Sequence, residues 1–222
     1  MHNDAGELDK LLQEKSVSLD TCPEMPLANV FAKWRGLPSG QEQELLGSFD
    51  HGSGGYLEYI MRYAARALYG LDHVDVAAEQ GVTIRTVRNA DYREVTLQDA
   101  QGAPLLRFAA VYGFRNIQNL VRKMKTGRAQ YHYVEVMACP SGCVNGGGQL
   151  RPPESIAAKE WFARVDALYR AVPGQWPEEN ADVAHVYAHW LGEPGSAAAR
   201  KALHTSYRAI EEANVNPLAV KW

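Results

Sequence analysis

Two cysteines that shortly precede a run of glycines constrain this chain more than any other part of its sequence. Cys139 and Cys143 stand four positions apart after the mostly apolar, β-branched segment 134–137, and three consecutive glycines follow at 146–148. Thiolates bind iron and zinc, and glycines allow backbone N–H groups to approach a bulky anionic centre. A strand that only buried two thiols would have no use for consecutive glycines, because they cost conformational entropy. The segment therefore predicts a metal or cluster site.

The number of cysteines excludes a disulfide framework. The chain has three, and the third, Cys22, stands in a segment rich in proline. An odd set of three in a chain whose start resembles no secretory signal peptide indicates a reducing compartment. The alternative interpretation of the pair is structural, since free cysteine commonly behaves as a small buried hydrophobe.

The composition is that of an ordinary globular protein, and it predicts neither a membrane nor a nucleic acid as partner. Of 222 residues, 46% are hydrophobic and 22% are charged, which suffices for one large domain or two small ones. No apolar run approaches the roughly 20 residues of a spanning helix. A net charge of −3 disfavours general nucleic-acid binding. We interpret a local basic cluster as the solvated face of one helix; the alternative is a phosphate-binding role. Its members are Arg115, Arg122, Lys123, Lys125 and Arg128.

Hydrophobic spacing predicts an α/β fold, a mixed sheet flanked by helices with a C-terminal helical extension. Helical periodicity covers 7–15, 56–69 and 114–125; strand patterns cover 82–88, 94–97, 105–111 and 131–137. The last strand carries the cysteines at its carboxyl end, where open α/β sheets tend to bind ligands. His132, at the start of this strand, could tune the site through a hydrogen bond. After residue 153 only helices are expected, the first capped by Ser155 and the last running from Leu203 to Ile210.

Residues 135–149 resemble the third cysteine motif of iron-only hydrogenases. The similarity is closer to their eukaryotic relatives in cytosolic iron-sulfur protein assembly, the nuclear prelamin A recognition factor-like proteins. The further matching segments are Gly52–Glu58, Tyr112–Val121, Tyr131–Tyr133, Leu203–Thr205 and the terminal Trp222. The resemblance divides the chain into a poorly matched connector with a short helix (1–50), an α/β lobe with the cysteine motif (51–153), and a helical extension with a tail (154–222).

The resemblance implies that Cys139 and Cys143 supply two of the four ligands of a [4Fe-4S] cluster. In such proteins two further cysteines come from an N-terminal lobe, and the fold has two similar lobes, of which this chain would be the second. Cys22 matches no ligand motif. A cubane cluster ordinarily requires four thiolates. We therefore expect a C-terminal portion or truncated form that binds a cluster weakly or not at all by itself, and that partners the missing lobe.

The function implied by the resemblance is that of a non-enzymatic carrier or adaptor in the cytoplasm, and also in the nucleus, that relays [4Fe-4S] clusters to apoproteins. Trp222 resembles the C-terminal tryptophan with which client proteins dock on the cytosolic iron-sulfur targeting complex. Two alternatives stay open. The chain could be a fragment of an iron-only hydrogenase and thus a redox enzyme, or its thiols could be relics while only helix surfaces act in protein contacts.

Overall fold

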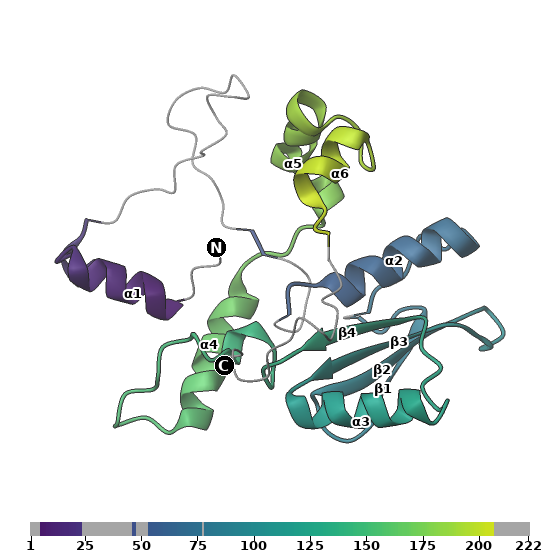
Figure 1. Cartoon of the computed structure of the whole chain (residues 1–222), viewed down its shortest axis with the longest axis horizontal. Coiled ribbons are helices and arrows are strands. Elements are labelled where there is room, and N and C mark those ends of the chain that lie inside the picture. The colour runs from purple at the N-terminus through teal and green to yellow at the C-terminus, as the bar shows by residue number, and fades with distance from the viewer. Residues whose placement is uncertain (1–4, 24–45, 48–52, 77, 207–222) are drawn as a thin grey trace, which may run out of the picture.

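The computed structural model describes residues 5–23, 46–47, 53–76 and 78–206, and places helices on both sides of one sheet (Figure 1). The α-helices are α1 (Ala5–Glu14), α2 (Tyr56–Tyr69), α3 (Phe114–Lys125), α4 (Ala158–Ala171), α5 (Ala181–Val186) and α6 (Ala197–Leu203). The strands are β1 (Val82–Thr86), β2 (Tyr92–Gln98), β3 (Pro104–Tyr112) and β4 (Tyr133–Met137). A π-helix, Tyr187–Leu191, continues α5. None of the described helices is long and apolar enough to span a membrane.

The sheet is mixed and follows the order of the chain, β1-β2-β3-β4. The first three strands pair antiparallel, and β4 pairs parallel with β3, in the register Val111 with Val136. A parallel pair needs a crossover connection, and α3 provides it between β3 and β4. The predicted α/β fold with a mixed sheet flanked by helices is confirmed.

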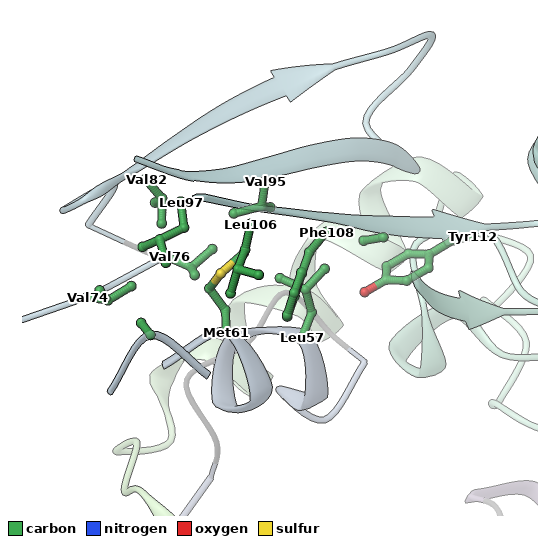
Figure 2. Close-up of a cluster of buried hydrophobic side chains, with 12 residues drawn as sticks. Leu57, Met61, Val74, Val76, Val82, Val95, Leu97, Leu106, Phe108 and Tyr112 are labelled. Carbon is green, nitrogen blue, oxygen red and sulfur yellow. The ribbon is translucent and has the colours of Figure 1, made fainter. Parts of the chain in front are cut away.

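The larger part of the core lies between α2 and one face of the sheet. Leu57 and Met61 point from α2 toward Leu97 and Phe108 on the strands, and all four are almost fully buried (Figure 2). Burial of each such side chain stabilises the fold by about 1.5–3 kcal/mol. A smaller cluster on the other face contains Leu120 of α3 with three sheet residues: Tyr92, Ala109 and Val111.

Glycine ends helix α2 where its amphipathic spacing ends. Gly70 adopts a left-handed conformation with φ of 66°, and its N–H donates to the carbonyl oxygen of Arg66 at 3.0 Å.

Both predicted helices 56–69 and 114–125 have the bounds that the sequence indicated. Each carries a continuous apolar stripe and lies against the sheet, so packing reinforces the local preference.

Two predicted helix boundaries in the C-terminal extension are wrong. The helix expected at Ser155 begins at Ala158, because the segment with Pro152 and Pro153 forms a separate turn that the Ile156 N–H closes onto the Pro153 carbonyl at 3.0 Å. The helix expected to run from Leu203 instead ends there, and the three residues after it are not helical. Tyr207 and Ile210 lie outside the described residues.

Candidate functional site

The two cysteines lie on a loop that we call the cysteine loop, residues 138–149, which directly follows β4. Cys139 is half-buried and Cys143 is exposed, and both are free thiols. The location at the carboxyl end of a parallel strand is the one that the sequence predicted. A parallel strand directs the residues after it to the edge of the sheet where open α/β folds bind ligands.

The turn between β3 and α3 anchors the start of the cysteine loop. Gly113 fills this turn with φ of 78° and ψ of 140°, and its N–H donates to the Met137 carbonyl at 2.9 Å. A Cβ atom at this position would lie 3.3 Å from Cγ of Pro140. Glycine is therefore required at position 113 for two reasons: the backbone conformation is one that side chains disfavour, and the loop approaches too closely for a Cβ atom.

A second anchor comes from the turn between β1 and β2. Ser141 has a left-handed φ of 62° and Gly142 follows with 77°. A left-handed conformation costs a residue with a side chain about 1–2 kcal/mol. The Asp91 carboxylate offsets part of this cost because its Oδ1 accepts the Ser141 N–H at 2.6 Å. Asp91, which lies outside the loop, thus stabilises the turn between the two cysteines.

The glycine side of the loop lies close to one sulfur. Gly146 donates its N–H to the Cys143 carbonyl at 3.0 Å, and an added Cβ would come within 3.1 Å of that oxygen and 4.0 Å of Cys139 Sγ. Gln149 closes the loop, since its Nε2 donates to the same carbonyl at 3.0 Å. The absence of a side chain at 146 therefore keeps space beside the Cys139 sulfur.

A cavity of about 440 Å³ separates the end of the cysteine loop from α4. Gly146 and Gly147 line it on one side and Trp161 and Phe162 on the other, whereas neither cysteine does. The Trp161 indole donates to the Leu150 carbonyl at 3.2 Å and so ties α4 to the end of the loop.

A buried carboxylate on β4 connects the cysteine-bearing strand to α2. Glu135 is only 4% exposed, and its two oxygens accept the Leu57 N–H, at 2.9 Å, and the Tyr112 hydroxyl. The Leu57 N–H belongs to the first turn of α2, where backbone donors have no partner within the helix and where negative charge is favourable. Burial and this hydrogen bond to Glu135 raise the pKa of Tyr112 above its usual range, so its hydroxyl remains a donor.

Glu135 is a positioning residue that the sequence analysis did not single out. Its position between Val134 and Val136 in an apolar strand could have identified it, because a carboxylate there is costly unless it is paired. It stands four positions before Cys139. The strand that presents the first thiol is therefore fixed to the sheet by β3 and to the helix layer by Glu135.

The donor set of the cysteine loop consists of the thiols of Cys139 and Cys143. No group of three or more cysteine, histidine or acidic side chains in the described part of the chain could hold a metal ion. Cys22 is exposed and follows a separate short helix, Leu19–Thr21. Soft sulfur ligands and the open glycine side fit an iron-sulfur cluster in kind, but they fill only half of a cubane's usual four thiolate positions.

Of the other two predicted functional residues, the structure describes only His132, which does not contact the thiols. His132 lies at the amino end of β4, where its Nδ1 accepts the Arg107 N–H at 2.9 Å. The strand separates it from the cysteine loop, so the predicted hydrogen bond to the site is wrong. Trp222 lies outside the described residues.

Comparison with protein families and relatives identifies similar proteins along almost the whole chain. The family model for iron only hydrogenase large subunit, C-terminal domain, matches residues 4–147, and that for iron hydrogenase small subunit matches residues 159–210. The cytosolic Fe-S cluster assembly factor narfl of Danio rerio is 47% identical over 218 residues, which are 98% of this chain and 50% of the relative. Cytosolic iron-sulfur assembly component 3 of Bos taurus is 45% identical over 217 residues, 98% of this chain and 42% of the relative.

Solved structures agree with this similarity. An [FeFe]-hydrogenase, HydA1 from Chlamydomonas reinhardtii, superposes with a TM-score of 0.63 at 26% sequence identity, over 90% of this chain and 53% of the hydrogenase chain. These similarities confirm the resemblance that the cysteine motif indicated. The chain spans about half the length of the curated relatives it matches.

Proposed function

This chain belongs to the family of the iron-only hydrogenase large subunit, C-terminal domain, and on that premise we propose that it is a non-enzymatic carrier or adaptor in cytosolic iron-sulfur protein assembly. In this role it helps to bind a [4Fe-4S] cluster and to deliver it to apoproteins of the cytoplasm and nucleus. Relatives that are named cytosolic Fe-S cluster assembly factors support this role over a hydrogenase.

The observation that carries the proposal is the arrangement of the cysteine loop. Its two thiols follow a buried strand, and Gly146 leaves room beside the Cys139 sulfur. A hydrogen bond from the Ser141 N–H to Asp91, outside the loop, holds the loop at this point, so its shape does not depend on the cluster alone. Such a preformed loop suits a protein that must accept a cluster and later release it.

We propose that the cluster is completed by two thiolates from a lobe outside this chain. The chain contributes Cys139 and Cys143, and the cluster supplies a redox-active iron centre when it is bound. The matching relatives are about twice as long as this chain, which leaves room for such a lobe.

Cluster transfer tests the proposed function. We expect the 222-residue chain alone to retain little iron after anaerobic reconstitution with iron and sulfide. A chimera in which it replaces the matching half of the Danio rerio relative should bind a cluster. The loaded chimera should then activate an apo [4Fe-4S] enzyme in the presence of an iron chelator, measured as recovered enzyme activity. Stable stoichiometric cluster on the chain alone, or activation abolished by the chelator, would contradict the proposal. Hydrogen evolution after di-iron maturation would favour the hydrogenase alternative.

We also propose that Trp222 docks the chain on the cytosolic iron-sulfur targeting complex. A terminal tryptophan supplies a large apolar surface for a partner's pocket, and tryptophan is a frequent anchor of protein interfaces. Deletion of Trp222 should lower capture of the purified targeting complex by about tenfold or more. The control is the substitution Leu168→Ala, which removes an exposed apolar side chain far from the terminus in sequence. Equal pull-down by the deleted and intact chains would refute the docking role.

A further inference from the structure

A cationic pocket lies on the sheet face that α3 covers only in part. On this face α3 buries Ala109 and Val111 of β3. Alternate residues of β1, β2 and β3 continue the face beyond the helix, and they are polar. They line a pocket of about 440 Å³ that we call the basic pocket. Its charged lining residues are Arg85, Glu94, Arg107, Lys123 and Arg128.

Positive charge dominates this pocket, with four cationic side chains against one carboxylate. Three neighbouring side chains already interact with the carboxylate of Glu94. Arg85 donates to it from Nε at 3.1 Å, the Tyr131 hydroxyl donates to its other oxygen, and Lys123 Nζ lies 3.7 Å away. Burial alone would raise the pKa of Glu94, but the hydrogen bonds from Tyr131 and Arg85 outweigh it and hold this pKa below its ordinary value. Glu94 therefore remains charged and leaves an excess of three positive charges.

Two of the arginines have no acidic partner within the described residues. Arg107 donates from Nη1 only to the amide oxygen of Gln130, at 3.4 Å, and Arg128 forms no ion pair there. Both side chains are exposed, so neither is needed to stabilise a buried charge. Guanidinium groups present paired N–H donors whose spacing matches the oxygens of a phosphate or carboxylate group.

We propose that the basic pocket binds a small, multiply charged oxyanion, a phosphate-bearing or polycarboxylate ligand. The hydroxyl of Thr96 and the side-chain amides of Gln98 and Gln130 add uncharged hydrogen-bonding groups to the lining. The volume falls within the range of about 300–1,000 Å³ usual for small-molecule sites. The net charge of the chain is −3, so the pocket stands out against an acidic background that would repel such ligands elsewhere.

The pocket is separate from the cysteine loop. Tyr131 and Gln130 precede β4, whereas Cys139 follows it. A strand of five residues extends about 17 Å. Oxyanion binding can therefore be measured without a cluster, and it does not depend on the assembly role being correct.

Calorimetric titration of the 222-residue chain with pyrophosphate and with citrate tests the proposal. We expect saturable one-to-one binding that weakens as salt screens the charges. The double substitution Arg107→Ala with Arg128→Ala should weaken binding by roughly 10- to 100-fold, because two charge-assisted contacts are lost. Binding of pyrophosphate alone identifies a phosphate-bearing ligand, of citrate alone a polycarboxylate, and of both a general oxyanion site.

Arg115→Ala is the matched control, since it removes an exposed arginine of α3 that does not line the pocket. This variant should bind as the unmodified chain does, and all variants should show the same urea unfolding transition. The absence of saturable binding of either probe at millimolar concentration would overturn the proposal. Equal affinities of the double variant and the unmodified chain would overturn it as well.

Discussion

Replacement of both Cys139 and Cys143 by serine is expected to remove a whole cluster from the chimera with the Danio rerio relative. Serine keeps the size of the side chain but not the soft thiolate that iron-sulfur clusters require. The two cysteines stand on one short loop, so loss of both removes half of the ligand set at once. Iron and acid-labile sulfide should each fall by about four atoms per chain relative to the unsubstituted chimera.

Cys22→Ser provides the matched control for this experiment. Cys22 is also a free, exposed cysteine, but it follows the separate helix Leu19–Thr21. The single substitution should leave the iron and sulfide contents unchanged. Retention of the full iron content by the double-serine variant would show that the cluster lies elsewhere, and the proposed site would have to be abandoned.

Truncation of Glu135 to alanine is expected to lower the free energy of unfolding by about 3–5 kcal/mol. The substitution leaves the Leu57 N–H and the Tyr112 hydroxyl, two buried donors, without their acceptor. It also opens space between β4 and α2. Since small domains are stable by only about 5–15 kcal/mol, such a loss would be a large part of the total. Urea unfolding followed by far-ultraviolet circular dichroism measures it.

Two further substitutions separate the hydrogen bonds from the loss of bulk. Glu135→Gln keeps the shape and one acceptor oxygen, so its unfolding free energy should lie between those of the alanine variant and the unmodified chain. Val136→Ala shortens the neighbouring side chain, which is 47% exposed, and should cost less than about 1 kcal/mol. If Glu135→Ala is no more destabilising than Val136→Ala, the buried carboxylate does not hold β4 to α2.

The sequence predicted those elements whose local preference and tertiary packing agree. Helices 56–69 and 114–125 show continuous apolar stripes, and the strand that ends at Met137 combines β-branched residues with a following turn. The helix expected at Ser155 shows the opposite case, because this apparent cap lies within the turn that follows Pro152 and Pro153, and the helix begins only at Ala158. A capping residue predicts a helix start only where the next residues can continue the helix.

The cysteines could be predicted as site residues because a short motif contains them, but the residues that hold the loop could not. Asp91 lies 50 positions before Ser141, and the Glu135 carboxylate meets the Leu57 N–H across 78 positions. Such contacts depend on strand order and register, which no local pattern encodes.

The basic pocket could not be predicted from local sequence either. It brings two residues of the predicted basic cluster, Lys123 and Arg128, together with arginines on the strands.

The place of β4 in the sheet affects how the protein behaves in concentrated solution. β4 hydrogen-bonds to β3 on one side only, and no strand of the described residues covers its outer side. The peptide groups on that side form a ready template for a strand of another molecule. An occupant of this outer side would shield these groups and prevent the stacking of identical copies that leads to aggregates.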